Sequence, residues 1–346
     1  MSPVLSVVIP AYGRVEPLKY TLRSVARSLR ESGRAGEIVL VDDGSPEALA
    51  GELEDFDPGW PVEIVRQDNS GSIVARMTGW RAARGKFVTF VDSDDLVHPA
   101  KFRSQLDVME NGVEEITYTD SARVVLGRDH SVESFAPLRT YRETRSAVEL
   151  LVTLFPCPHS PVFRRDYLDR ALSLPAVPAR RIFDSCGDVW LYRNLALHPT
   201  RARKVPGHYA GIGIHDHGRF TDCWEKLGVA ALGIDEAVMG ACEGVAATEP
   251  LRRAIGEGAF HAFRLLPPDV PQDFEARLLR LWRESPASAG RPRGGRGFRA
   301  LASCVGPIAA ARWVRWWRRP RYADCKTLAD KQAFQHLLGE LPPLAA

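Results

Sequence analysis

Strand-like and helix-like segments alternate over the first 120 residues, about every 20–25 residues, and this alternation limits the possible folds more than any other feature. The apolar runs are short and nearly continuous, as in strands buried on both faces, and the segments between them carry apolar residues at helical spacing. The pattern predicts an α/β fold with a Rossmann-like, mostly parallel sheet flanked by helices. We expect strands at Leu5–Ile9, Glu37–Val41, Val62–Val65, Lys86–Val91 and Ile116–Thr119, and helices at Glu16–Leu29, Ser70–Ala83 and Pro99–Met109.

Carboxylates follow two of the expected strands directly. Asp42 and Asp43 follow the second strand, and Asp92–Asp95 (DSDD) follows the fourth. Because ligands of such sheets bind beyond the carboxyl ends of the strands, the fold would gather these side chains at one edge. Close carboxylates repel one another, and oxygen-only ligands suit a hard cation such as Mg²⁺ or Mn²⁺. A metal site is therefore one interpretation of Asp92–Asp95, and an acidic turn that caps the next helix is the other.

Two common nucleotide-binding signatures are missing from the sequence. The turn after the first strand, Pro10–Arg14, reads PAYGR rather than G-x-G-x-x-G, and the chain has no G-x-x-x-x-G-K-[ST]. A dinucleotide-binding domain and a P-loop phosphotransferase are therefore both disfavoured. The formal net charge of +3 is too small to argue for a nucleic-acid partner.

Three segments, VVIPAYGR, EIVLVDDGS and GSIVARMTGWRAARGKFVTFVDSDD, resemble in their order and spacing the motifs of family 2 glycosyltransferases of the GT-A fold. The resemblance is strong over Val4–Asp95 and weak over Ile116–Arg219. It implies an inverting enzyme that moves a sugar from a nucleotide-diphosphate sugar, most readily a UDP-sugar, to an acceptor hydroxyl or similar nucleophile. It also implies Mn²⁺ or Mg²⁺ as the cofactor, and it leaves a glycan, a lipid-linked molecule or a small molecule open as the acceptor.

The resemblance assigns roles to residues of the nucleotide-binding half. One of Asp42 and Asp43, preferably Asp42, would bind the uracil-like edge of the base, and Arg76 would lie near the base and the phosphates. Asp94 would ligate the metal that bridges the diphosphate. The other implied nucleotide contacts are Pro10, Ala11 and Tyr12 around the base and ribose, and Asp92 with Ser93 at the ribose, while Asp95 would lie behind them or cap the next helix.

A second marker is the segment from Asp184 to Leu191, which begins an apolar helix. Asp188 would stand in the first turn, where the helix dipole favours an ionised carboxylate. The resemblance implies that Asp188 is the catalytic base that takes the acceptor's proton, although Gly187 replaces the usual Glu before it. A helix cap is the alternative role for Asp188, and Asp184 is the competing candidate for the base.

Histidines outside these motifs have weaker assignments. His215 follows an expected strand at Arg203–Ile214, and the resemblance makes it a candidate metal ligand, with Arg219 as a candidate phosphate contact. His159, next to Ser160, either faces the acceptor or is a buried structural histidine, and the residue pattern leaves both readings open.

The domain organisation follows from where the alternation stops. We expect a glycosyltransferase domain at 1–219, with a nucleotide-sugar-binding half at 1–120 and an acceptor half at 121–219. A helical C-terminal region at 220–346 would contain a Gly/Pro/Arg-rich loop near 286–299. Within that region Trp313, Trp316 and Trp317 are interleaved with five arginines from Arg312 to Arg321. On a helix, this pattern of Trp and Arg predicts either peripheral contact with a membrane, or packing against the rest of the protein or within a homo-oligomer.

The remaining features bear on location and on other functions. The first residues lack a basic region and have a short apolar run, so we expect a first strand rather than a signal peptide. No apolar stretch approaches the roughly 18–20 residues that span a bilayer, and the six cysteines are scattered. We therefore expect a cytoplasmic protein, with peripheral contact at the inner face of the membrane left open. A sugar nucleotidyltransferase or a non-catalytic GT-A-like binding protein are the alternative functions.

Overall fold

The structure is a computed structural model that describes residues 2–213, 223–290 and 294–341. The chain forms two compact units. The N-terminal unit comprises Met1–Pro175, Ala179–Arg181 and His198–His217, and the C-terminal unit comprises Ala176–Pro178, Ile182–Leu197 and Gly218–Ala346.

Within the described residues, nine strands of the N-terminal unit form one sheet in the order β3-β2-β1-β4-β8-β6-β9-β5, with β7 paired to β6. Strands β1 to β4 run parallel to one another, and β8 and β7 add antiparallel neighbours. The expected α/β fold with a mostly parallel sheet is confirmed. The strands are β1 Leu5–Ala11, β2 Gly36–Asp42, β3 Val62–Arg66, β4 Phe87–Phe90, β5 Leu96–Val97, β6 Ile116–Leu126, β7 Val132–Arg139, β8 Val162–Arg164 and β9 Ala202–Ile212.

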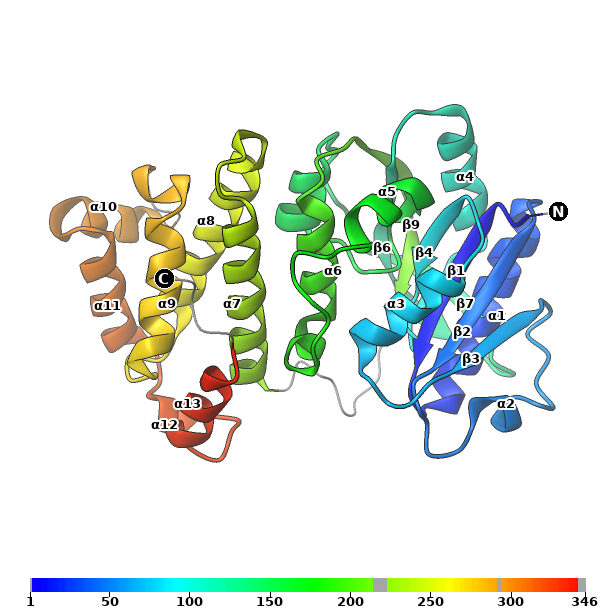
Figure 1. The fold of residues 1–346 in the computed structure, drawn as a ribbon, viewed down its shortest axis with the longest axis horizontal. Helices are drawn as coiled ribbons and strands as arrows, with labels where there is room; N and C mark the ends of the chain where they lie inside the picture. The colour runs from blue at the N-terminus through cyan, green and yellow to red at the C-terminus, as the bar shows by residue number, and fades with distance from the viewer. Residues whose placement is uncertain (1, 214–222, 291–293, 342–346) are drawn as a thin grey trace. The chain divides into compact units, whose positions relative to one another are not determined.

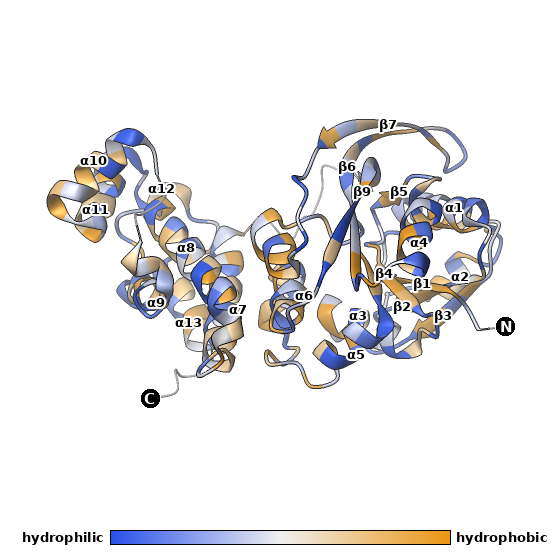
Figure 2. Ribbon diagram, turned by 90° about the horizontal axis from the view of Figure 1, so that it is seen from above, coloured by the Kyte–Doolittle hydropathy of each residue, from blue (hydrophilic) through white to orange (hydrophobic). Residues whose placement is uncertain are grey.

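Helices cover both faces of this sheet, α1 and α4 on one face and α3 on the other (Figures 1 and 2). Helix α3 lies very close to the sheet because it presents Gly79 there. A Cβ atom at Gly79 would lie 2.3 Å from Cγ1 of Val8 and 3.0 Å from Cγ2 of Val41. The helices of this unit are α1 Val15–Ser32, α2 Leu49–Glu52, α3 Ser72–Ala82, α4 Lys101–Asn111 and α5 Arg165–Leu172, with a π-helical turn at Glu149–Leu154.

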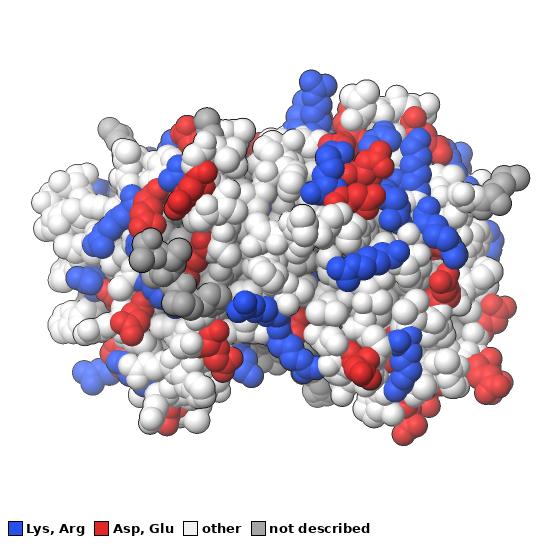
Figure 3. Space-filling model, viewed as in Figure 1, with Lys and Arg blue, Asp and Glu red and all other residues white. Residues whose placement is uncertain are grey.

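The apolar runs of β1, β2 and β4 are fully buried, which is why they read as continuous hydrophobic segments. Their side chains, together with those of α1 and α4, make the main core of the unit. At the surface, basic and acidic side chains are interspersed over the N-terminal unit on the face drawn in Figure 3.

The described residues of the C-terminal unit form helices and the turns between them, and they contain no strand. The unit contains an apolar cavity of about 570 Å³, lined mainly by side chains of α7, α8 and α9. No helix in the described parts of the chain is long and apolar enough to cross a membrane. The helices are α6 Gly187–Ala196, α7 Trp224–Ala241, α8 Glu249–Leu265, α9 Gln272–Arg283, α10 Arg296–Val305, α11 Pro307–Arg318, α12 Tyr322–Cys325 and α13 Lys331–Gly339.

One expectation for this unit is wrong in part. The Gly/Pro/Arg-rich stretch 286–299 is not a loop throughout, because Pro286–Ala289 forms a 3₁₀ turn and α10 begins at Arg296. Tertiary packing overrides the composition here. The Phe298 ring lies 3.7 Å from the Arg264 guanidinium and 6.5 Å from the Phe260 ring, so the first turn of α10 is held against α8.

Candidate active site

The carboxyl ends of β1, β2 and β4 meet at one edge of the sheet because these strands are parallel neighbours. In the register of the sheet, Ala11 is paired with Asp42, and Val8 is paired with Phe90. The Asp43 amide also donates to the Ala11 carbonyl over 2.9 Å. Both acidic loops therefore flank the turn that follows β1, as the sequence pattern predicts. Tyr12, in that turn, is 52% exposed.

Asp42 is buried and holds the loop that follows β2. Its carboxylate accepts hydrogen bonds from the backbone amides of Ser45 over 2.8 Å and Leu49 over 3.1 Å, and it pairs with the Arg66 guanidinium. Burial acts to raise the pKa of Asp42, but these hydrogen bonds outweigh burial and lower the pKa. The Ser45 hydroxyl in turn accepts from the Gly13 amide over 2.9 Å, which ties the loop to the turn after β1.

Asp43 is buried as well and connects β2 to the start of α3. Its carboxylate accepts from the Gln67 side-chain amide over 2.7 Å and from the Ser70 and Gly71 backbone amides over 2.9 Å. The intervening Gly44 has a φ of 72°, and a Cβ there would lie 2.6 Å from the Asn69 amide nitrogen. Asp43 and Gly44 together bring the loop after β2 into contact with the N-terminus of α3.

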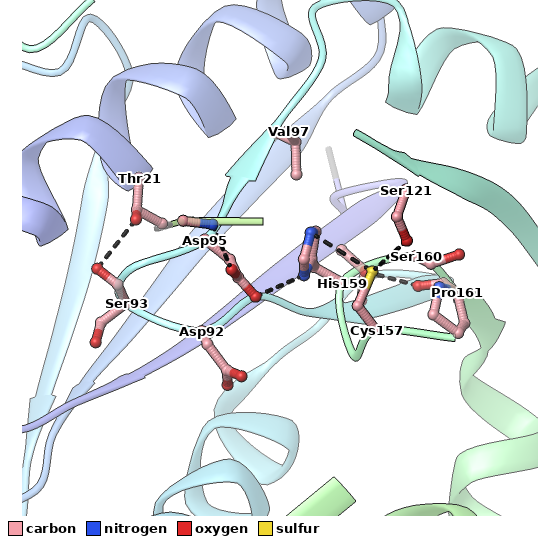
Figure 4. A network of polar contacts seen from close by, with 12 residues as sticks. Thr21, Asp92, Ser93, Asp95, Val97, Ser121, Cys157, His159, Ser160 and Pro161 are labelled. Carbon is pink, nitrogen blue, oxygen red and sulfur yellow. Dashed lines mark hydrogen bonds and ion pairs between the residues drawn. The ribbon is translucent and has the colours of Figure 1, made fainter. Parts of the chain in front are cut away.

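The Asp92–Asp95 segment is a tight turn fixed from both sides. The Asp95 amide donates to the Asp92 carbonyl over 3.0 Å, and the Thr21 hydroxyl of α1 donates to the Ser93 carbonyl over 3.0 Å (Figure 4). The backbone amide of Gly213, which directly follows β9, donates to the Asp95 carboxylate over 3.0 Å. A Cβ at Gly213 would lie only 1.7 Å from the Asp94 carbonyl oxygen, so the close approach of β9 requires glycine.

Arginines pair with the two carboxylates that the resemblance places at the ribose and the metal. Arg76 lies 2.6 Å from the Asp92 carboxylate, and Arg14 lies 3.1 Å from the Asp94 carboxylate. Arg76 is a buried residue of α3, so this ion pair holds the Asp92 carboxylate in a fixed orientation. Arg14 was not predicted as a site residue. Its only sequence signal is that it is the basic residue of the PAYGR turn, which has to face the acidic edge.

Asp95 points in a different direction, toward a buried histidine, while Asp92 points away from that histidine (Figure 4). The Asp95 carboxylate lies 2.8 Å from Nδ1 of His159, which is fully buried. On its other side the His159 ring lies 3.7 Å from Sγ of Cys157. Burial acts to lower the pKa of His159, but the Asp95 carboxylate and the Cys157 thiol raise it well above its usual value. Of the two readings left open for His159, the buried structural histidine is the one observed.

The donor set at this edge fits a hard divalent cation that is shared with a substrate. Asp94 offers carboxylate oxygens and is partly exposed, and Mg²⁺ is commonly held by one or two carboxylates together with phosphate oxygens. In the described parts of the chain no group of three or more His, Cys, Asp or Glu side chains is arranged to hold a metal ion. His215 and Arg219, the other two residues proposed for this region, lie outside the described residues.

Asp188 belongs to the C-terminal unit and is the second residue of α6, in the first turn as expected. It is half-buried. Helix α6 is anchored by the Trp190 indole, which donates to the Val177 carbonyl over 2.8 Å, and by Arg193, which lies 2.6 Å from the Asp235 carboxylate of α7. Asp184, the competing candidate, lies in the 3₁₀ turn Arg181–Cys186 that precedes α6.

The family description that fits this chain is Glycosyl transferase family 2, which matches residues 6–172. Residues 6–172 form a family 2 glycosyltransferase domain. The domain runs from the first residues of β1 to the last residue of α5. It therefore contains the whole carboxyl edge described above, and the resemblance inferred from the motifs is confirmed.

The chain also has relatives among curated protein sequences. EpsJ of Bacillus subtilis, an uncharacterized glycosyltransferase, is 35% identical over 121 residues, which cover 32% of this chain and 34% of EpsJ. GlyG of Streptococcus pneumoniae, a glycosyltransferase, is 37% identical over 100 residues, which cover 28% of this chain and 32% of GlyG. YibD of Escherichia coli is 33% identical over 101 residues, which cover 29% of this chain and 28% of YibD. The matches span about a third of each relative's length.

The fold of the chain is also similar to that of a solved structure. Residues 1–349 of TarS from S. aureus superpose with a TM-score of 0.53 at 16% identity, and the match covers 91% of each chain. The same part of TarS has been crystallised in complex with UDP-GlcNAc, with a TM-score of 0.51 at 14% identity and 92% of each chain covered. The likeness establishes that the glycosyltransferase domain and its helical extension have a fold in common with TarS.

Proposed function

We propose that the chain is an inverting glycosyltransferase that takes a sugar from a UDP-sugar and transfers it to an acceptor nucleophile, with Mn²⁺ or Mg²⁺ at the diphosphate. One observation carries most of the proposal. Asp92 and Asp94 lie beside Arg76 and Arg14 at the carboxyl edge of a family 2 domain. The complexes of TarS with UDP and UDP-GlcNAc support uridine as the nucleoside of the donor.

The base and ribose would bind above the two loops that follow β1 and β2. Tyr12 offers a half-exposed aromatic face for the base. A carboxylate has about four acceptor positions, so Asp42 or Asp43 can accept a hydrogen bond from a uracil N–H in addition to those that hold the loops. Arg76 keeps the Asp92 carboxylate in place for a ribose hydroxyl.

The diphosphate would bind at the exposed side of Asp94. When bound, the metal ion supplies positive charge to the oxygens on which negative charge develops as the sugar–phosphate bond breaks. Asp94 would ligate that ion, and Arg14 would add a fixed positive charge beside it. Pre-positioned charge of this kind stabilises the transition state without reorganisation during the reaction.

The acceptor would be activated by a separate carboxylate. In a direct displacement with inversion, one carboxylate takes the proton of the attacking hydroxyl, and Asp188 is the proposed base. Its place in the first turn of α6 favours the ionised form that a base requires.

The proposal predicts that nucleotide binding depends on metal and on Asp94. In isothermal titration with UDP, the wild-type protein should bind at least tenfold more tightly with Mn²⁺ than with EDTA. The Asp94→Ala variant should lose that gain, because it removes the proposed protein ligand of the ion. Asp55→Ala, at an exposed carboxylate of the same unit, is the matched control and should bind like wild type.

The reaction is checked separately by following UDP-sugar in the presence of Mn²⁺. Release of UDP, with water or an added sugar as acceptor, supports the transferase. Release of pyrophosphate from a nucleoside triphosphate and a sugar phosphate would instead identify a nucleotidyltransferase. Metal-dependent UDP binding without any turnover would identify a non-catalytic binding protein, and equal UDP affinity of Asp94→Ala and wild type would refute the metal role.

A further inference from the structure

The strongest imbalance of charge in the chain lies in its C-terminal part. From Ser285 to Ala323 the sequence contains nine arginines and no Asp, Glu or Lys, which leaves 37 basic and 43 acidic residues elsewhere. The structure folds the described part of this segment mainly into α10 and α11, a helical hairpin joined at Gly306 and Pro307 (Figure 1). We call residues 296–321, which comprise the two helices and the three residues after them, the α10–α11 hairpin.

The inner side of the hairpin is fixed to the rest of the unit by Arg315, which is buried. Its guanidinium lies 2.8 Å from the Glu275 carboxylate and donates to the Pro267 carbonyl over 2.7 Å. Ala310 and Ala311, on the same helix, are also buried. The packing alternative raised by the sequence therefore holds for this side of α11.

The outer side of α11 carries large aromatic side chains that the fold leaves uncovered. Trp313, Trp316 and Trp317 are 56%, 73% and 64% exposed, and the rings of Trp313 and Trp317 stack with centroids 6.2 Å apart. Three aromatic side chains gathered on one helix face are unusual on a monomer surface, and such patches mark interaction sites.

Arginines border these tryptophans. Arg318, the last residue of α11, lies 5.2 Å from the Trp317 ring, and Arg319 and Arg321 follow directly after the helix, where both are exposed. None of these three arginines forms an ion pair with a carboxylate in the parts of the chain that the structure describes. Val305 and Cys304 are also exposed, at the end of α10. The hairpin thus presents tryptophans and positive charge together.

The chemistry of this surface fits a layer of anionic lipid. Tryptophan prefers the headgroup region of a bilayer, where its ring is partly buried and its N–H stays hydrated. Arginines near an anionic membrane surface are attracted to its lipid phosphates. Two short helices, one following the other through Gly306 and Pro307, can lie in the interfacial plane.

Other occupants fit less well. A second copy of the chain would bring the arginines of one hairpin against those of the other, and like charges across an interface oppose association. The apolar cavity of about 570 Å³ adds an argument, because Arg319 and Pro320 form part of its lining. A lipid whose phosphate contacts Arg319 would have apolar space for an acyl chain next to it.

We propose that the α10–α11 hairpin docks the protein on an anionic phospholipid surface. Trp313, Trp316 and Trp317 enter the headgroup region, and Arg318, Arg319 and Arg321 contact lipid phosphates. This docking does not depend on the glycosyltransferase activity proposed above. It requires only the exposed face of the hairpin.

The test is flotation of the full chain with vesicles of phosphatidylcholine alone or with about one-third phosphatidylglycerol. At low salt we expect binding to the anionic vesicles at least tenfold stronger than to the neutral ones, with release at high salt because surface charges are screened. The variant Trp313→Ala/Trp316→Ala/Trp317→Ala should lose at least tenfold in affinity. The control Val113→Ala/Leu174→Ala removes exposed apolar side chains of the N-terminal unit and should bind like wild type.

A second pair of variants tests the charges independently. Reversal of Arg318, Arg319 and Arg321 to Glu should abolish binding, whereas reversal of three exposed arginines of the N-terminal unit, Arg103, Arg123 and Arg128, should not. Far-ultraviolet circular dichroism shows whether each variant is folded. Equal binding to neutral and anionic vesicles, or unchanged binding by both hairpin variants, overturns the proposal. So does a wild-type protein that ignores vesicles but dimerises, or that binds single-stranded RNA, through the same residues.

Discussion

At the scale of single residues, the Asp92–Asp95 turn meets three basic side chains that come from three different places. Arg76 comes from α3, Arg14 from the turn before α1, and His159 from the loop before β8. The sequence predicts that the carboxylates meet at one edge and that something positive must offset their repulsion. It does not predict the partners, because residues 80 and 64 positions apart have no spacing rule that links them.

His159 is expected to position the Asp92–Asp95 turn without contacting substrate. Replacing it with Leu leaves the Asp95 carboxylate without its buried partner and should lower the free energy of unfolding by about 2–4 kcal/mol. It should also weaken UDP binding by loosening the turn. His159→Gln keeps a donor for Asp95 and should recover most of both losses. Urea denaturation and UDP titration measure the two effects, and a Leu variant as stable as wild type would contradict the role.

The free energy of unfolding should depend on pH through Lys101. Its ammonium group is fully buried, with the Gln105 side-chain oxygen and the Ser160 carbonyl as acceptors, and burial lowers the pKa of Lys101 to about 7. Between that pH and the unfolded value near 10.5, the unfolded chain binds more protons than the folded one. The contribution of Lys101 to the free energy of unfolding therefore rises with pH in this range and is lowest below pH 7.

The matching variant is Lys101→Met, which keeps the apolar stem and removes the titration. It should be more stable than wild type at pH 6 by up to a few kcal/mol, since each pKa unit corresponds to about 1.4 kcal/mol. The difference should shrink as the pH approaches 10. Urea denaturation from pH 6 to pH 10 checks this, and a constant difference over that range would show that Lys101 does not titrate there.

At the scale of elements, the strands could be predicted because a strand that is buried on both faces has a nearly continuous apolar sequence. The first strand begins at Leu5 as expected and ends at Ala11 instead of Ile9. The second strand covers Gly36–Asp42 instead of the expected Glu37–Val41. At Glu149–Leu154 the chain forms a π-helical turn rather than an α-helix. Apolar spacing does not distinguish i to i+4 from i to i+5 hydrogen bonds over so short a segment. The position of β8 between β4 and β6 could not be predicted either, because strand order depends on contacts between residues that are far apart in the sequence.

The close packing of α3 makes a testable element-scale prediction. Gly79→Ala places a methyl group against Val8 and Val41 and should lower the free energy of unfolding by about 1–3 kcal/mol, despite the better helix propensity of Ala. Because α3 carries Arg76, UDP binding should weaken as well. Gly51→Ala, on α2 of the same unit, meets no atom within 4 Å and should be neutral or slightly stabilising. Thermal unfolding compares the two; equal melting temperatures would mean that α3 shifts freely.

At the scale of the whole molecule, the residues proposed for the reaction belong to two different compact units. Asp92 and Asp94 belong to the N-terminal unit and Asp188 to the C-terminal unit. The motifs predicted both groups of residues, because each lies in a segment with a local signature. The contacts that build the C-terminal unit, such as Glu275 with Arg312 and Arg315, join residues about 40 positions apart and left no such signature.

This division predicts that binding and turnover can be separated by mutation. Asp188→Asn should bind UDP with Mn²⁺ within about twofold of wild type while its turnover falls by about 10²–10⁴, the usual contribution of a general base. Asp184→Asn is the matched control and should keep near-normal turnover. Titration calorimetry and initial rates with a UDP-sugar give both quantities. If Asp184→Asn were the inactive variant, the base would have to be reassigned to Asp184.

The exposure of Cys304 on α10 has a practical consequence. Among the six cysteines, all of which lie in the described residues, it alone is exposed, and the other five are partly or fully buried. The native chain therefore offers a preferred attachment point for a maleimide fluorophore or a nitroxide spin label on the α10–α11 hairpin. A label there would report the local polarity and the depth of the hairpin in real time, without any engineered cysteine.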